Sequence, residues 1–327
     1  MKLALGTAQF GLDYGISNNQ GQVNKSEVAD ILKLAIHLGI DTLDCAGAYG
    51  NSEEVLGDIL KHQPIKQQFN IVSKIPALTD KQSSIGQFFT KSLEHLHRDK
   101  IDILLFHHAD NLLNHPKKND LFAQLNSIKF QGKVNRIGVS VYSPEQLKAI
   151  ALSYPIDVAQ VPLNIFDQRF MSAELFNLCQ QKNIKLHARS LFLQGLLLIK
   201  PEELPAYFKP YQDKFIAVRE LAKYLNCSIL ALALSIAVSD IPSLAIQSDA
   251  NINKKSANKN KKSAIGLKKS DLIEKIVIGV CTTTQLTEIV TAYQQATELK
   301  ISIQELVSLA DNRVGLLNPN LWVAKTN

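Results

Sequence analysis

Apolar residues recur along this chain in two alternating patterns, short strand-like runs bounded by turns and longer segments with an apolar stripe at helical spacing. Strands that alternate with helices predict a parallel sheet whose strands are joined by crossover helices. The strand-like runs are residues 2–7, 40–44, 69–74, 101–107, 136–142, 157–163, 184–190 and 275–279. Eight is the number that closes a (β/α)8 TIM barrel, so we predict an α/β protein of that fold.

The segments between the runs carry helix signals. Residues 25–39 form an amphipathic stripe that Gly39 ends. Asn51-Ser52, followed by two glutamates, predicts a capped helix start, and Ser143-Pro144-Glu145 predicts another before a helix near 144–153. The alternative fold is a doubly wound open sheet, but the stretch GTAQFG at 6–11 lacks the glycine spacing of a dinucleotide-binding turn.

Composition fits one large folded unit. The chain has 327 residues, 46% of them apolar and 20% charged, and barrels of this length commonly form one domain, so we predict one domain across 1–327. No apolar run is long enough for a signal peptide or for the roughly 18 residues of a membrane span, which predicts a cytoplasmic protein without membrane association. The four cysteines are widely spaced, and we expect reduced thiols.

The basic charge comes from one segment. Residues 245–270 contain seven lysines and one acid, so they alone account for the formal net charge of +6. The segment has few apolar residues and precedes the last predicted strand, which places it on the barrel face opposite the active site. We predict a disordered low-complexity insertion there rather than a nucleic-acid-binding arm, and we expect no nucleic-acid partner.

Polar side chains stand where the second, third and fourth strands end. Asp44, Lys74 and His107 occupy these ends, and Tyr49 lies in the loop after Asp44. The carboxyl ends of barrel strands meet at the face that holds the active site. Side chains alternate along a strand, so His107 and His108 point to opposite faces, which disfavours a metal site built from this pair. We predict one site made of four residues and no metal.

This set of residues suits the reduction of a carbonyl group. An ammonium within about 4 to 6 Å stabilises a phenolate, so Lys74 is expected to lower the pKa of Tyr49. Asp44 would keep Lys74 charged and oriented. His107 would donate a hydrogen bond to a substrate carbonyl while Tyr49 delivers the proton and a hydride arrives from elsewhere.

The same residues resemble the aldo-keto reductases. The stretch DCAGAYGNSEEVLG at 44–57 is followed by VSK ending at Lys74 and LLFH ending at His107, in the family's order and at similar spacings. GTAQFG, IGVS (137–140), QVPLN (160–164), LQGLL (193–197) and LNPNLW (317–322) extend the resemblance over nearly the whole chain. It implies a catalytic tetrad of Asp44, Tyr49, Lys74 and His107, with Tyr49 as the general acid.

The resemblance also implies a bound NADP(H). Ser140 and Gln160 match positions that hold the nicotinamide carboxamide, and the loop from about Leu191 to Leu197 would lie along the pyrophosphate. The cofactor-binding residues that the resemblance implies are Ser140, Gln160, Arg189, Leu191, Gln194, Gly195, Leu196, Gly279, Cys281 and Gln285.

Several positions depart from the family pattern. Arg189 stands where many members have a tyrosine stacked on the nicotinamide, Val141 where many have a carboxamide-binding asparagine, and His108 where a tryptophan is common. Val280 and Gln285 replace the basic residues that typically grip the 2′-phosphate, which leaves NAD(H) open as the cofactor. The guanidinium of Arg189 could stack or meet an anionic group of cofactor or substrate, or form a supporting ion pair.

Two functions are compatible with these observations. The first is an NAD(P)(H)-dependent oxidoreductase that acts on a small-molecule aldehyde or ketone, sugar-like in character because the barrel mouth would be polar. The second is a non-catalytic nucleotide-binding regulatory subunit of the same fold. The complete tetrad favours the enzyme. The sequence predicts neither a particular substrate nor an oligomeric state.

Overall fold

The computed structural model describes residues 1–61, 69–239 and 269–322. The predicted insertion at 245–270 therefore lies outside the described residues, except for its last two. In the described part of the chain, no single helix is long and apolar enough to cross a membrane.

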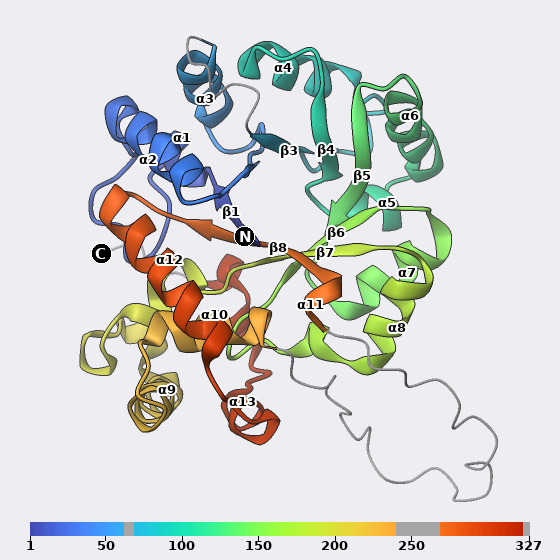
Figure 1. Ribbon diagram of the computed structural model, residues 1–327. Helices are drawn as coiled ribbons and strands as arrows, with labels where there is room; N and C mark the ends of the chain where they lie inside the picture. The colour runs from blue at the N-terminus through green and yellow to red at the C-terminus, as the bar shows by residue number, and fades with distance from the viewer. Residues whose placement is uncertain (62–68, 240–268, 323–327) are drawn as a thin grey trace, which may run out of the picture.

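Eight parallel strands form a closed barrel in chain order, and the last strand pairs with the first (Figure 1). The strands are β1 (Leu3–Gly6), β2 (Thr42–Asp44), β3 (Asn70–Ile75), β4 (Ile101–Phe106), β5 (Val134–Ser140), β6 (Val158–Pro162), β7 (Lys185–Arg189) and β8 (Ile273–Gly279). Each overlaps a run predicted from the sequence, and β3, β5 and β8 extend one or two residues beyond it. The predicted (β/α)8 barrel is thus confirmed, and the open sheet is wrong.

Helices surround the barrel and cover the outward face of its strands (Figure 1). The longer ones around the wall are α2 (Lys25–His37), α3 (Ser52–Leu60), α4 (Gly86–Leu96), α6 (Lys118–Phe130), α7 (Pro144–Ser153), α8 (Ala173–Gln181), α10 (Ile229–Val238) and α12 (Thr283–Glu298). Short helices are α1 (Ala8–Gly11), α5 (Asp110–Leu113), α11 (Lys269–Leu272) and α14 (Val314–Leu317). The 3₁₀ segments are Arg169–Met171, Leu193–Leu198, Pro201–Glu203, Ala206–Tyr211 and Pro319–Leu321.

Three apolar clusters hold this arrangement together. The largest lies between the strands and the surrounding helices. A second, separate cluster joins α9 (Gln212–Tyr224) and α13 (Ile303–Leu309) to the segment after β7, and buries Phe208 and Phe215. The third fills the inside of the barrel with Val72, Ile103, Leu105 and Val158. The barrel is therefore a packed core, and the polar strand ends lie above its apolar filling.

One of the two predicted helix caps is confirmed. The Ser143 side chain accepts a hydrogen bond from the Gln146 amide at the start of α7, as predicted. Asn51 holds the corresponding place before α3, but its side chain caps no amide of that helix. The Ser52 hydroxyl is buried and lies 2.8 Å from both the carbonyl oxygen and the hydroxyl of Thr7. The predicted cap at 51–52 is thus wrong, because Ser52 ties α3 to the end of β1.

Two glycines allow the loop after β2 to pass close to the loop after β1. A Cβ atom on Gly11 would overlap the carbonyl oxygen of Tyr49 and the amide nitrogen of Ser52. Gly50 has a φ of 58° and lies directly against the Gly11 carbonyl. Gly47, by contrast, is exposed, and the nearest atom to its added Cβ would be 3.9 Å away. The position of Tyr49 therefore depends on Gly11 and Gly50 rather than on Gly47.

We expect Gly11→Ala to lower the free energy of unfolding by about 2 kcal/mol or more, because the new methyl group must displace backbone on both sides. Gly47→Ala is the matched control and should change the value by less than about 0.5 kcal/mol. Urea unfolding followed by circular dichroism measures both. Equal effects of the two variants would contradict the packing described for the loop.

Candidate active site

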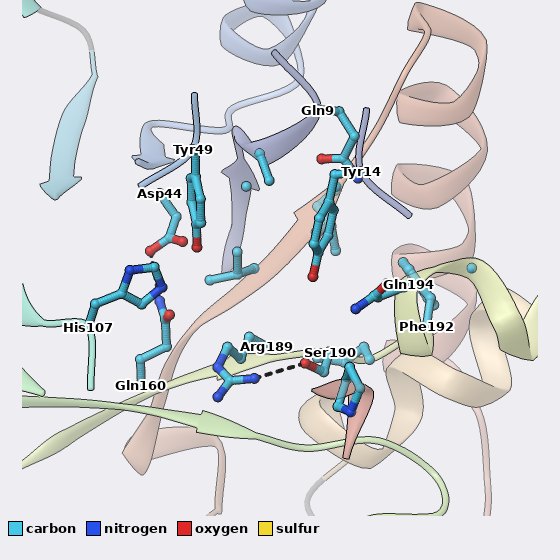
Figure 2. A pocket seen from close by; sticks show the side chains of 18 of the residues that line it. Gln9, Tyr14, Asp44, Tyr49, His107, Gln160, Arg189, Ser190, Phe192 and Gln194 are labelled. Atoms are coloured by element: carbon cyan, nitrogen blue, oxygen red, sulfur yellow. Dashed lines mark hydrogen bonds between the residues drawn. The ribbon is translucent and has the colours of Figure 1, made fainter. Parts of the chain in front are cut away.

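The carboxyl ends of the strands surround a cavity of about 380 Å³. Asp44, Tyr49, His107, Gln160 and Arg189 all line it, and Figure 2 shows their side chains pointing inward from separate elements. Lys74 lies behind Asp44 and is almost fully buried. The structure thus brings the four predicted residues Asp44, Tyr49, Lys74 and His107 into one place.

A buried ion pair forms the base of the site. Lys74 Nζ lies 2.7 Å from Asp44 Oδ2 and donates a second hydrogen bond of 2.7 Å to the carbonyl oxygen of Cys45. The other carboxylate oxygen of Asp44 accepts a 2.7 Å hydrogen bond from Gln160 Nε2. Both oxygens of the carboxylate are therefore satisfied, which is the condition for keeping a charge inside a protein.

Tyr49 lies between this ion pair and His107. Lys74 Nζ is 5.0 Å from the centre of the Tyr49 ring, and the rings of Tyr49 and His107 meet edge to face with centres 5.5 Å apart. In Figure 2 the Tyr49 hydroxyl points into the cavity beside the His107 imidazole. A carbonyl oxygen placed there could contact both side chains.

The pKa of Tyr49 differs from the sequence-based expectation, whereas the charged state expected for Lys74 agrees with it. Burial raises the pKa of Tyr49, and the opposing effect of Lys74 does not cancel it. The expected lowering of that pKa by Lys74 is thus only one contribution, and the net shift is upward. Burial alone would lower the pKa of Lys74, but Asp44 and Tyr49 outweigh it, so the pKa is raised and the amine stays charged.

His107 is held in its neutral form. Burial lowers the pKa of His107 to about 3, and the positive charge of Lys74 acts in the same direction. A neutral imidazole carries one N–H and can donate a single hydrogen bond without adding charge to the cavity.

The neighbouring histidine faces away from the cavity. His108 Nδ1 lies 3.1 Å from Asp110 Oδ2, and its ring packs against that of Tyr142. Within residues 1–61, 69–239 and 269–322, no three His, Cys, Asp or Glu side chains are grouped so that they could hold a metal ion.

A second cavity of about 330 Å³ adjoins the first. Six residues line both cavities, namely Gln9, Tyr14, Phe192, Gln194, Gly195 and Gly279. Most of the predicted cofactor-binding residues line one cavity or both. The first cavity is lined by Gln160, Arg189 and Leu191, and the second by Cys281 and Gln285. Both cavities are lined by Gln194, Gly195 and Gly279. Ser140 and Leu196 line neither cavity: Ser140 is buried at the end of β5, and Leu196 packs in the cluster around Phe208.

Arg189 lies at the end of β7 on the wall of the first cavity (Figure 2). Its guanidinium carbon stacks 4.5 Å from the centre of the Tyr142 ring. The guanidinium donates one hydrogen bond of 3.1 Å to the Ser190 hydroxyl and one of 3.3 Å to the carbonyl oxygen of Val141. Both acceptors are neutral.

Several lining residues were not predicted from the sequence. Gln9 and Tyr14 come from the segment after β1, and Tyr142 follows β5. Tyr14 lies across the cavity from Tyr49, and its hydroxyl points toward the Gln194 side chain (Figure 2). The signal that could have indicated them is their place after a strand end, because loops at that face of a barrel line the active site.

Comparison with known proteins places this architecture among enzymes. The family model "Aldo/keto reductase family" matches residues 2–304. Glyoxal reductase of Bacillus subtilis (strain 168) is 30% identical over 177 residues, which cover 54% of this chain and 62% of that protein. NADH-specific methylglyoxal reductase of Escherichia coli (strain K12) is 26% identical over 216 residues, 60% of this chain and 65% of that protein.

The chain therefore covers less than two thirds of the length of these two relatives. A solved structure, the holo form of an aldo-keto reductase from Bacillus halodurans, has the same fold. It matches with a TM-score of 0.67 at 17% identity, and the match covers 95% of this chain and 92% of that one.

We expect the imidazole of His107 to remain neutral throughout pH 5 to 8, because its pKa is lowered to about 3. Nuclear magnetic resonance titration of the labelled histidine rings measures this, and the signal that disappears in His107→Gln assigns the resonance. A midpoint near the ordinary value of about 6.5 would refute the neutral form.

Proposed function

Because this chain belongs to the aldo/keto reductase family and is an oxidoreductase, we propose that it reduces a small aldehyde or ketone, or oxidises the corresponding alcohol, with Tyr49 as the acid and base. The observation that carries the proposal is the meeting of Tyr49, His107 and the Lys74–Asp44 ion pair in one cavity. The alternative of a non-catalytic regulatory subunit is dropped, since the similar proteins are named as oxidoreductases.

Tyr49 is proposed as the proton donor to the carbonyl oxygen. Its raised pKa keeps the phenol protonated at neutral pH, so a proton is available. The charge of Lys74, 5.0 Å from the ring, stabilises the phenolate that forms as the proton leaves. Asp44 holds Lys74 in that position and keeps it charged.

His107 is proposed to orient the carbonyl. Its neutral ring lies edge to face with Tyr49, so one N–H can donate to the oxygen that receives the proton from Tyr49. An imidazolium would compete with Tyr49 as a proton source, and the lowered pKa of His107 avoids this.

The two adjoining cavities fit a nicotinamide dinucleotide, the cofactor class of this family. When bound, NAD(P)H supplies the hydride for the carbonyl carbon. Gln160 and Arg189 would contact the end nearest Tyr49, and Gln194 and Gly195 would lie along the middle, where both cavities meet. Gly195 allows Ser17 to pack directly against this loop, because a Cβ at residue 195 would overlap the Ser17 hydroxyl.

We favour NAD(H) as the preferred form, although the family resemblance alone favours NADP(H). Among the described residues that line the second cavity there is no lysine or arginine, whereas Glu288 is one of them. A 2′-phosphate would thus meet no cation there and one carboxylate. Gln285 is held by its side-chain oxygen, which accepts a 2.7 Å hydrogen bond from the Cys281 amide.

The substrate is proposed to be small and polar. Besides Asp44, Tyr49 and His107, the first cavity is lined by polar groups from Gln9, Tyr14, Tyr142, Ser190 and Asn320. They suit a sugar-like carbonyl compound or a short oxoaldehyde, and two relatives are named for glyoxal and methylglyoxal.

Tyr49→Phe should lower turnover of a short aldehyde such as methylglyoxal by about 10²- to 10⁴-fold, because a general acid contributes that much. The dissociation constant for NADH should stay within about threefold. Steady-state kinetics and fluorescence titration measure the two quantities. Tyr154→Phe, which removes a remote surface hydroxyl bonded to Asn119, is the control and should keep full activity. If Tyr49→Phe turns over normally, another group is the acid.

Titration of the chain with NADH and NADPH side by side should give tighter binding of NADH. Gln285→Arg should then improve the affinity for NADPH relative to NADH by about tenfold or more, because it places a cation at the second cavity. Gln294→Arg adds the same charge on an exposed part of α12 outside the cavity and should leave the ratio unchanged. Tighter binding of NADPH by the unaltered chain would reverse the assignment.

A further inference from the structure

The guanidinium of Arg189 brings a positive charge to the first cavity, and no described carboxylate pairs with it. Its two hydrogen-bond acceptors are the Ser190 hydroxyl and the Val141 carbonyl oxygen, and its stacking partner is the Tyr142 ring. In the part of the chain that the structure describes, no carboxylate forms an ion pair with it. Arginine stays protonated at any working pH, so the charge is permanent.

The other described residues that line the cavity contribute no net charge once Lys74 is counted with Asp44. Asp44 is paired with Lys74 at 2.7 Å, so these two charges cancel. His107 is neutral, because its pKa is lowered to about 3. Tyr14 and Tyr49 are protonated, because burial raises the pKa of each. Arg189 therefore sets the sign of the electrostatic potential in the described lining of the cavity.

The reaction of the proposed function changes the charge of one ring. A carbonyl compound, a proton and NADH give an alcohol and NAD⁺, in which two electrons leave the dihydronicotinamide as hydride. The ring is neutral before the transfer and carries one positive charge after it. The phosphates have the same charge in both forms, so any effect on them cancels when the two forms are compared.

The ring must lie near Arg189 for a geometric reason. Hydride and proton go to the two atoms of one carbonyl group, so the ring has to lie beside the carbonyl that Tyr49 and His107 contact. Arg189 lines the same cavity of about 380 Å³ as those two residues. Two like charges within such a space repel each other, and the repulsion is strong because the site is partly shielded from water.

On the basis of the proposed function, we propose that Arg189 makes the site discriminate against the oxidised nicotinamide, so that the reduced cofactor binds more tightly and the oxidised cofactor leaves more readily after reduction. A tyrosine or other neutral side chain at this position would lack the effect. At a separation of about 7 Å and an effective dielectric constant of about 40, the repulsion corresponds to roughly a tenfold difference in dissociation constant.

The experiment measures binding rather than turnover. The dissociation constants of NADH and NAD⁺ are determined by calorimetry for the unaltered chain, Arg189→Met, Arg189→Lys and Lys33→Gln. We expect Arg189→Met to lower the ratio of the NAD⁺ constant to the NADH constant about tenfold, mainly through tighter binding of NAD⁺. Arg189→Lys keeps the charge and should retain most of the ratio. Lys33→Gln removes a positive charge on α2 that does not line the cavity, and should leave the ratio unchanged.

Three outcomes would overturn the inference. An unchanged ratio in Arg189→Met, with binding intact, would show that the charge does not act on the ring. Equal weakening of both cofactor forms would show that Arg189 holds the phosphates instead. If Arg189→Lys lowers the ratio of the NAD⁺ to the NADH dissociation constant as much as Arg189→Met does, the shape of the side chain rather than its charge is responsible. If the unaltered chain binds no nicotinamide cofactor of any kind, the proposed function itself fails, which is a different result from a changed or unchanged ratio.

Discussion

The ion pair between Lys74 and Asp44 is the interaction on which the site depends. It is buried, and two further hydrogen bonds support it, one from Lys74 to the Cys45 carbonyl oxygen and one from Gln160 to Asp44. Asp44 ends β2, Lys74 lies on β3 and Gln160 lies on β6, so one network joins two neighbouring strands to a strand on the far side of the barrel. The charge and orientation at Tyr49 follow from this network, and removal of either ion would leave the other buried without its counter-ion.

The eight strands could be predicted because each is buried and apolar enough to form a distinct run, and turns separate the runs. The convergence of Asp44, Lys74 and His107 followed from the same pattern, since the ends of parallel strands meet at one face. The direction of His107 and His108 followed from the alternation of side chains along β4. These features depend on local periodicity, which a single sequence contains.

Features that depend on contacts between distant segments could not be predicted. The hydroxyl of Ser52 looks like a helix cap in the sequence, but it bonds Thr7, which lies 45 positions earlier. The glycines that matter for the loop after β2 are Gly11 and Gly50, since only the folded chain brings their backbones together. The net pKa of Tyr49 depends on burial as much as on Lys74, and burial is a property of the whole cavity.

The closure of the barrel has a consequence for how the protein is made. Gly6 at the end of β1 pairs with Gly279 at the end of β8, and both residues line the first cavity. This seam joins the beginning of the chain to a strand synthesised more than 260 residues later. A ribosome-bound chain can therefore carry Asp44, Lys74 and His107 on consecutive strands and still have no complete cavity around them. Formation of the cavity waits for a contact of very large sequence separation, which is the kind that slows folding.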